Sequence, residues 1–298
     1  MDNIIDFTDA EINYLKMYGG RNGGKLCVVY NGDNYMLKFP PKPSQNSEAS
    51  YINSCVCEYV ACHIFEALGF ESQTTLLGKY NNKIVVACKD FETDGFSLFE
   101  FAHLKNTIVE SPGSGYGTEL SEVLFAIKDQ SILPAAELEE SFWNMFVVDA
   151  LVGNFDRHNG NWGFLINKDT KQVRIAPVFD CGSCLYPQLN EDGMKYVLDN
   201  RGEIEKRLFI FPNSSLKMND VKINYAEFLA NTEHEGCVKA LGTISRRIDL
   251  DKINHIINDT PLISDINKLF FITMIKERKE RIIDNAIKLR NESVEELL

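Results

Sequence analysis

Several features are absent from this sequence, and each absence excludes a class of protein. A membrane-spanning helix needs roughly 18 or more consecutive apolar residues, and no such run occurs in the chain. The first residues, MDNIIDFTD, are acidic and polar, and they lack the basic start and the apolar core of a secretory signal peptide. We therefore expect no membrane span and a protein that is cytoplasmic as synthesised, with export by a route that needs no such signal left open.

An excess of positive charge is also absent. The 43 acidic residues outnumber the 31 lysines and arginines, so the formal net charge is −12. Binding to nucleic acid depends largely on cations that displace counterions from the phosphates. We therefore expect no nucleic-acid partner, although a local basic patch is compatible with this charge.

The cysteines lack the spacing of a zinc site. Cys181-x-x-Cys184 is a candidate metal or redox pair, but no second C-x-x-C pair exists to complete a four-cysteine site. Most of the cysteines lie within apolar runs, where cysteine behaves as a small apolar residue. We predict buried, reduced thiols in a reducing compartment. The eight cysteines are Cys27, Cys55, Cys57, Cys62, Cys88, Cys181, Cys184 and Cys237.

Three polar residues in the middle of the chain have a spacing that suits phosphoryl transfer from a nucleotide. Asp156 precedes Asn161 in the run DRHNGN, and Asp180 follows in the run VFDCG. Such a transfer needs a carboxylate that orients the attacking hydroxyl, together with an amide and a second carboxylate that hold Mg²⁺ on the phosphates. These three residues supply those groups in that order.

The predicted local structure brings the three residues toward one place. Residues 137–152 have the apolar spacing of a helix, which Gly153 ends. Residues 162–166 and 172–176 read as two strands joined by a polar turn. Because a hairpin returns the chain to its starting point, we expect Asp180 to lie near the loop of residues 156–161.

A glycine-rich segment, GGRNGGK, lies near the N-terminus. Its glycines leave backbone N–H groups free to approach a phosphate closely, although a flexible linker has the same composition. It is not a Walker A loop, because Leu26 stands where that motif requires serine or threonine. The candidate phosphate-binding residues are Gly20, Arg21, Asn22, Gly23, Gly24 and Lys25.

The next residues predict a hairpin and a helix that carry one lysine and one glutamate. Residues 25–30 and 34–39 read as strands joined by Asn31-Gly32, and the second strand carries Lys38. A helix is predicted from Ser47 to Leu68, with Glu58 at the border of its apolar stripe. A glutamate at that position can pair with the strand lysine and fix its ammonium group.

Other segments have simpler predictions. Thr8-x-x-Glu11 is typical of a capping box and predicts a short helix up to Gly19. Residues 71–77 and 83–88 read as strands, and Lys89, Asp90 and Phe91 would cross to a second half of the molecule.

The rest of the chain is predicted to contain an exposed loop and then helices. Residues 111–117 (SPGSGYG) have the composition of an exposed flexible loop. After Asp180 the chain reads as irregular, and from about Met218 onward as helical. The clearest helix covers residues 266–289, and its charged section 276–281 reads as a solvated face.

The order of these features resembles that of the HipA-like bacterial serine/threonine protein kinases, over about residues 15–290. The D-x-H-x-x-N loop and the F-D element are the specific parts of this resemblance. It implies an α+β, bilobal protein-kinase-like fold, with an N-lobe (1–91) of antiparallel sheet plus helix and a mostly helical C-lobe (92–298). It also implies ATP- and Mg²⁺-dependent phosphorylation of serine or threonine in a protein substrate, and autophosphorylation.

The resemblance also implies a role for each candidate residue. Lys38 matches the lysine that binds the phosphates, and Glu58 matches its ion-pair partner. Asp156 matches the catalytic acid, and Asn161 and Asp180 match the metal ligands. The glycine-rich segment matches the loop that covers the phosphates. In a bilobal kinase the crossing segment at residues 89–91 offers backbone groups to the adenine edge.

Some features depart from other kinases. The eukaryotic order H-R-D is replaced by Asp156-Arg157-His158, and we group His158 with the catalytic residues. Cys181 stands where eukaryotic kinases place phenylalanine after the second metal ligand, and no A-P-E element appears. The chain is shorter than the HipA toxins, so we do not carry over their partnership with a DNA-bound antitoxin.

Two alternative functions compete with the protein kinase. A lipid or small-molecule kinase is one, because D-R-H-x-x-N also looks like the loop of phosphoinositide kinases. Residues 183–191 contain no lysine or arginine, which disfavours an anionic lipid headgroup as acceptor. A nucleotide-binding scaffold without catalysis is the other. The sequence specifies neither the protein substrate nor the oligomeric state.

Overall fold

The computed structural model describes residues 4–19, 24–40, 52–109 and 113–295. The chain forms two compact units, which we call unit 1 and unit 2. Unit 1 comprises Met1–Phe91, Pro177–Asp199 and Asp251–Ile272. Unit 2 comprises the remaining segments, Glu92–Ala176, Asn200–Leu250 and Thr273–Leu298.

Unit 1 is built on a six-stranded, mostly antiparallel sheet with the order β1-β5-β6-β4-β3-β2. Asn31 and Gly32 join two of its strands with φ angles of 50° and 85°, as a two-residue hairpin requires. This confirms the predicted hairpin. The strands are β1 (Ile5–Asp6), β2 (Glu11–Ile12), β3 (Lys25–Tyr30), β4 (Asp33–Lys38), β5 (Thr75–Tyr80) and β6 (Lys83–Lys89).

The prediction of a helix near the N-terminus is wrong. β1 pairs in parallel with β5, and β2 pairs antiparallel with β3. The Thr8 amide donates to the side chain of Asp6, forming a turn instead of a helix cap. Phe7 is fully buried in the cluster that includes Val28, Leu37 and Val85. Burial of this aromatic ring and the two strand pairings therefore override the local capping signal.

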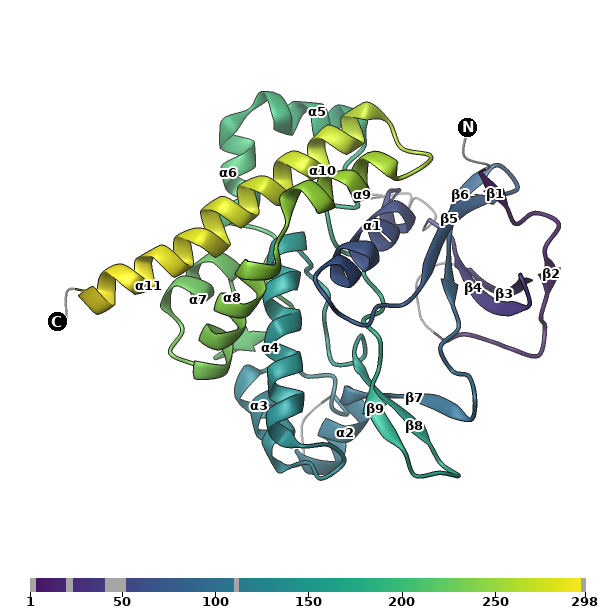
Figure 1. Ribbon diagram of the computed structural model, residues 1–298, viewed down its shortest axis with the longest axis horizontal. Coiled ribbons are helices and arrows are strands. Elements are labelled where there is room, and N and C mark those ends of the chain that lie inside the picture. The colour runs from purple at the N-terminus through teal and green to yellow at the C-terminus, as the bar shows by residue number, and fades with distance from the viewer. Residues whose placement is uncertain (1–3, 20–23, 41–51, 110–112, 296–298) are drawn as a thin grey trace. The chain divides into compact units, whose positions relative to one another are not determined.

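Helix α1 (Ser54–Ala67) packs against β5 and β6, as Figure 1 shows. Gly69, with φ 87°, ends it as predicted, whereas its predicted start at Ser47 lies outside the described residues. Glu58 is only 2% exposed, so its predicted place at the border of the buried stripe is wrong. The reason is that α1 is covered on two sides: Cys57 also contacts the carbonyl of Leu185.

Unit 2 is mostly helical around α4 (Ala135–Val152), which packs against α3 and α8 (Figure 1). Gly153, with φ 65°, ends α4 as predicted. β8 and β9 form the predicted hairpin, and β7 completes a three-stranded sheet. The other elements of unit 2 are α2 (Phe101–Ile108), α3 (Leu120–Asp129), α6 (Arg201–Phe209), α7 (Tyr225–Asn231), α8 (Glu235–Arg247), η1 (Lys279–Asp284), α11 (Asn285–Glu295), β7 (Phe96–Glu100), β8 (Gly163–Asn167), β9 (Val173–Ile175), β10 (Lys217–Met218) and β11 (Val221–Lys222).

Two predictions for the second half of the chain need correction. The segment after Asp180, predicted to be irregular, includes α5 (Glu191–Asp199) as well as α6. The predicted C-terminal helix is present as α10 (Asp265–Arg278), η1 and α11, but Arg278 in its charged section is 1% exposed. Its guanidinium donates to the carbonyls of Ala150 and Arg207 within unit 2, so Arg278 does not belong to the solvated face. The side chains of Lys276 and Glu280 are 60% and 49% exposed, as predicted for this section. The remaining helix is α9 (Leu250–Asp259).

No helix among the described residues is long and apolar enough to cross a membrane.

Candidate active site

Strand β4 and helix α1 place Lys38 and Glu58 against each other in the interior of unit 1. The Lys38 Nζ atom lies 2.7 Å and 2.8 Å from the two carboxylate oxygens of Glu58. It also lies 2.9 Å from Oδ1 of Asp180, which follows β9 in the chain. The structure thus joins three of the predicted residues in one charged cluster, which we call the Lys38 cluster.

The charges of the Lys38 cluster strongly shift one another's pKa values. Burial by itself lowers the pKa of the Lys38 ammonium, but the carboxylates of Asp180 and Glu58 outweigh this, so the pKa lies well above its ordinary value. Burial raises the pKa of Glu58, and the positive charge of Lys38 opposes that rise. Lys38 is therefore a fixed cation at neutral pH. Its two partners differ, because the Asp180 side chain is 45% exposed and that of Glu58 only 2%.

The backbone around Asp180 is held in an uncommon conformation. Asp180 has a φ of 55°, in the left-handed region that residues other than glycine seldom adopt. The amide of Cys181 donates to Glu58 at 3.4 Å, and the Phe179 ring contacts the Phe91 ring with centroids 5.6 Å apart. Such outliers persist where neighbouring contacts fix them, and they concentrate at functional sites.

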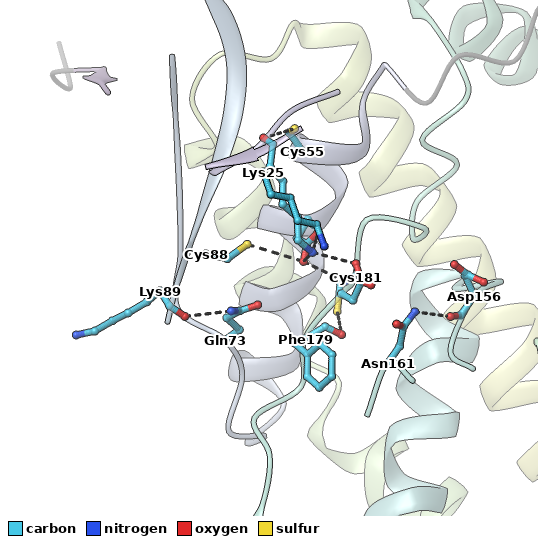
Figure 2. Close-up of polar contacts among 12 residues, drawn as sticks. Lys25, Cys55, Gln73, Cys88, Lys89, Asp156, Asn161, Phe179 and Cys181 are labelled. Carbon is cyan, nitrogen blue, oxygen red and sulfur yellow. Dashed lines mark hydrogen bonds and ion pairs between the residues drawn. The ribbon is translucent and has the colours of Figure 1, made fainter. Parts of the chain in front are cut away.

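Thiol groups lie close to the Lys38 cluster, and Figure 2 labels those of Cys55, Cys88 and Cys181. The Cys55 thiol donates to the Lys38 carbonyl at 3.3 Å, and the Cys88 thiol to Glu58 at 3.9 Å. All eight cysteines are buried and free of disulfides, as predicted. Burial raises the pKa of Cys88 well above its ordinary value, so this thiol is neutral and unreactive. Cys181 and Cys184 belong to no group of three or more metal-binding side chains within the described residues.

The glycine-rich segment is described only at its ends. Gly20, Arg21, Asn22 and Gly23 lie outside the described residues. The Lys25 ammonium donates to the Gly19 carbonyl at 2.6 Å. Burial, followed by repulsion from the Lys38 charge, lowers the pKa of Lys25.

The predicted adenine-binding residues are engaged in contacts within unit 1. Lys89 pairs with Asp33 at 2.6 Å, and its carbonyl accepts a hydrogen bond from the Gln73 side chain at 3.0 Å (Figure 2). The buried Asp90 carboxylate pairs with Lys16 at 2.9 Å and accepts from the Tyr18 hydroxyl at 3.1 Å. The Asp90 side chain thus anchors the segment that leads into the glycine-rich loop.

In unit 2, the loop after α4 holds Asp156 and Asn161 together. The Asn161 side-chain amide donates to the Asp156 carbonyl at 2.8 Å, as Figure 2 shows. The Asp156 amide donates to the Asn154 side chain at 3.0 Å. Because the Asn161 nitrogen is used in this way, its side-chain oxygen is the atom left to act as a ligand.

A buried ion pair between Asp149 and Arg157 supports this loop, and our sequence analysis does not predict it. Arg157 Nε lies 3.0 Å from Oδ2 of Asp149 on α4, and Arg157 Nη1 donates to the Asn161 carbonyl at 3.0 Å. Asn154 donates to the same Asp149 carboxylate at 2.8 Å. The available signal was an aspartate inside the apolar run FVVDALV, where an acid needs a buried partner.

His158 shapes the same loop. Its Nδ1 accepts a hydrogen bond from the Gly160 amide at 3.0 Å, which assigns the proton of the neutral ring to Nε2. Its ring lies edge-on to Tyr116, with centroids 6.3 Å apart. The structure thus places the predicted residues in two sets: the Lys38 cluster in unit 1, and Asp156, His158 and Asn161 in unit 2.

Comparison with known proteins places this chain among relatives. A family model for the HipA-like C-terminal domain matches residues 21–247, well over half of the chain. The chain belongs to the HipA-like family. A curated relative, the serine/threonine-protein kinase CtkA of Helicobacter pylori strain J99, is 53% identical over 283 residues, which cover 95% of this chain and 87% of CtkA.

Solved structures agree with this family. The crystal structure of a Helicobacter pylori proinflammatory kinase, CtkA, matches with a TM-score of 0.91 and 51% identity, covering 96% of this chain and 98% of CtkA. HipA of Shewanella oneidensis MR-1, solved with HipB and operator DNA, matches with a TM-score of 0.57 and 13% identity, covering 94% of this chain and 70% of HipA, which is a likeness of fold alone. The predicted α+β, kinase-like fold is confirmed, and the chain is a HipA-like protein kinase.

Proposed function

We propose that this protein transfers the γ-phosphoryl group of ATP, with Mg²⁺, to serine or threonine hydroxyls of a protein substrate. The observation that carries the proposal is the Lys38 cluster, in which a buried glutamate fixes a lysine beside a half-exposed aspartate. Protein kinases use this arrangement to hold the phosphates and the metal. The lipid or small-molecule alternative gains no support from the relatives.

The residues of unit 1 suit the nucleotide. Lys38 would bind the phosphates, and Glu58 would keep its ammonium in position. Asp180 has a side chain that is 45% exposed, so it can bind a metal while Lys38 stays paired with Glu58. Asp90 would act indirectly, since its carboxylate is engaged with Lys16 and Tyr18. Residues 20–25 would cover the phosphates, and the backbone of residues 89–91 would face the adenine.

Oxygen ligands of the kind that Mg²⁺ prefers are available in both units. The Asp180 carboxylate and the Asn161 side-chain oxygen are such ligands. When bound, the ion would neutralise charge that develops on the β- and γ-phosphates. We propose an N-lobe that ends at Phe91 and a C-lobe that begins at Glu92.

Asp156 would orient the acceptor. The serine or threonine oxygen attacks the γ-phosphorus, the bond from that phosphorus to the β–γ bridging oxygen breaks, and ADP leaves. Asp156 takes the hydroxyl proton. Asn154 and Asn161 hold the backbone on either side of this carboxylate, so it needs little reorganisation. We also propose that the enzyme autophosphorylates, and the candidate hydroxyls are those of Thr107, Ser111, Ser114, Tyr116 and Thr118.

The test is mass spectrometry of the purified protein after incubation with Mg-ATP, with and without an added protein acceptor. We expect phosphoserine or phosphothreonine with the wild type and none with Asp156→Ala or Asp180→Ala. Circular dichroism checks that the variants are folded. Undiminished transfer to protein by folded Asp180→Ala would overturn the proposal, and so would transfer to lipid vesicles alone.

A further inference from the structure

The loop of residues 113–118 is hydrogen-bonded to residues 156–161 of unit 2, which we call the catalytic loop because the proposed catalytic acid Asp156 lies in it. Asn159, in the middle of the catalytic loop, is fully buried. Its side-chain amide donates to the carbonyl of Gly115 at 2.8 Å and to that of Gly117 at 2.7 Å. These two carbonyls stand on either side of Tyr116. The position of Tyr116 is therefore set by the catalytic loop itself, which a flexible surface loop would not require.

A second buried group fastens the same loop from the other side. Lys105 of α2 is fully buried, donates to the Gly117 carbonyl at 3.0 Å, and pairs with Glu122 of α3. Gly115 has a φ of 81°, and a Cβ atom there would overlap the carbonyl of Ala102. Burying an ammonium group is costly unless its bonds are satisfied. Here its bonds fix the backbone beside Tyr116.

The hydrogen bonds of Asn159 and Lys105 hold Tyr116, and with it Glu100, beside Gly160 of the catalytic loop. The Tyr116 hydroxyl donates to Oε2 of Glu100 at 2.6 Å. A Cβ atom on Gly160 would lie 2.8 Å from the Tyr116 ring, 3.0 Å from the His158 ring and 3.2 Å from Oε2 of Glu100. Gly160 lies between the catalytic acid and the amide ligand in the sequence. The phenol and the carboxylate therefore border the residues that would meet the acceptor hydroxyl.

Glu100 carries a charge that no lysine, arginine or histidine among the described residues neutralises through an ion pair. Tyr116, which is 44% exposed, donates a hydrogen bond to Oε2 of Glu100 and leaves Oε1 of Glu100 available to accept from a ligand. A carboxylate held in this way favours a guanidinium or ammonium group, through a charge-assisted hydrogen bond. The net charge of −12 also favours approach of a basic partner.

We propose that Glu100 and Tyr116 form an acceptor subsite that selects protein substrates with a lysine or arginine close to the phosphorylated serine or threonine. Glu100 binds the cation, and Tyr116 positions the carboxylate. The proposal rests on the proposed function, because only a phosphoryl transfer to protein has an acceptor of this kind. It assigns a specific role to a loop whose composition indicates only flexibility.

The experiment compares a basic and an acidic acceptor, lysine-rich histone and dephosphorylated casein. Initial rates are measured against the concentration of each acceptor and of ATP, together with ATP hydrolysis without acceptor. We expect the wild type to prefer histone. Glu100→Gln should raise the KM for histone about 10-fold, the loss of one charge-assisted hydrogen bond, and leave the KM for ATP unchanged. Tyr116→Phe should raise it about 3-fold, because it removes the hydrogen bond that positions the carboxylate but leaves the charge of Glu100 in place.

Two further variants separate charge recognition from a structural role. Glu100→Lys should shift the preference toward casein, whereas a merely structural residue would lower both rates equally. Glu233→Gln removes the same charge from an exposed position elsewhere in unit 2 and should behave as wild type. If Glu100→Gln does not fold, Tyr116→Phe carries the test, since it keeps the carboxylate and its effect must fall on histone alone.

Different failures have different meanings. Equal transfer to histone and casein by the wild type, or an equal loss on both in Glu100→Gln, would overturn the subsite. Hydrolysis of ATP by the wild type without transfer to either protein would overturn it as well and leave nucleotide chemistry standing. A wild type that neither hydrolyses ATP nor transfers phosphate would overturn the proposed function itself.

Discussion

The candidate residues of unit 1 and those of unit 2 hold their charged groups by different means. In unit 1, Lys38, Glu58 and Asp180 hold one another, so the groups proposed for the chemistry are also the groups that neutralise a buried charge. In unit 2, the backbone on each side of Asp156 is held by side chains that take no part in the proposed reaction. Activity and stability should therefore separate cleanly in unit 2 and only partly in unit 1.

The largest effect on stability should come from the support behind the catalytic loop. Asp149→Asn leaves the buried Arg157 guanidinium without its carboxylate, and breaking a buried ion pair in this way costs about 3–5 kcal/mol. Asp156→Asn should cost less than about 1 kcal/mol, since its site is half-buried and held through the backbone, yet lower kcat by about 10²- to 10⁴-fold. Urea unfolding and phosphoryl-transfer rates measure the two quantities.

The control for this pair is Glu233→Gln, which should change neither quantity. An Asp149→Asn protein as stable as the wild type would show that the ion pair does not support the loop. The same experiment tests the comparison itself, because a large loss of stability in Asp156→Asn would mean that unit 2 also couples folding to its reactive carboxylate.

The candidate residues of both units could be picked out because each is marked by local sequence. Asn31-Gly32 fixes the hairpin that carries Lys38, and the D-R-H-x-x-N loop follows a helix that ends at Gly153. The supporting residues were not predictable from local signals. Asp149 is one acid in an apolar run, and its partner Arg157 reaches it only after the chain has turned at the end of α4.

Long-range pairing explains the wrong predictions in the same way. Thr8 and Glu11 have the spacing of a helix cap, but residues 5 and 6 pair with Gly78 and Lys79 of β5, which no local pattern shows. Local sequence predicts a helix-border position for Glu58 because the segment after Asp180, which also covers it, is more than a hundred residues away in the sequence. Local sequence thus marks the candidate polar groups better than it predicts their burial.

An intermediate effect should distinguish the two carboxylates of the Lys38 cluster. Glu58→Gln removes the buried partner and should cost about 1–3 kcal/mol of stability, because Asp180 still pairs with Lys38. Asp180→Asn removes the half-exposed partner and should cost less than about 1 kcal/mol. Both variants should lose most of their transfer activity, Asp180→Asn by about 10³-fold or more if Asp180 holds the metal.

Urea unfolding combined with Mg-ATP kinetics tests whether Glu58→Gln loses more stability than Asp180→Asn. A larger loss of stability in Asp180→Asn than in Glu58→Gln would reverse the assignment of which acid is structural.

The effect that is smallest at neutral pH, and that grows only above pH 9, concerns the buried thiols. Burial raises the pKa of Cys55 in unit 1 and of Cys237 in unit 2 from 9.0 to about 12. Because the unfolded thiol loses its proton near pH 9 and the folded one near pH 12, their contribution to stability is complete below pH 9. It declines by about 1.4 kcal/mol per thiol for each pH unit above that. The pKa values of Cys57, Cys62 and Cys88 are also raised, so thiols of this kind are concentrated in unit 1. We expect unit 1 to open first as the pH rises.

Pulse alkylation with iodoacetamide between pH 8 and pH 11 measures the pH at which each thiol becomes accessible. The labelling is normalised to urea-unfolded protein and read by peptide mass spectrometry. Cys55 and Cys88 should be labelled at a lower pH than Cys237, and Cys237→Ser should leave their labelling unchanged. Labelling of Cys237 before the thiols of unit 1 would contradict the expectation that its buried thiols make unit 1 the first to open at alkaline pH.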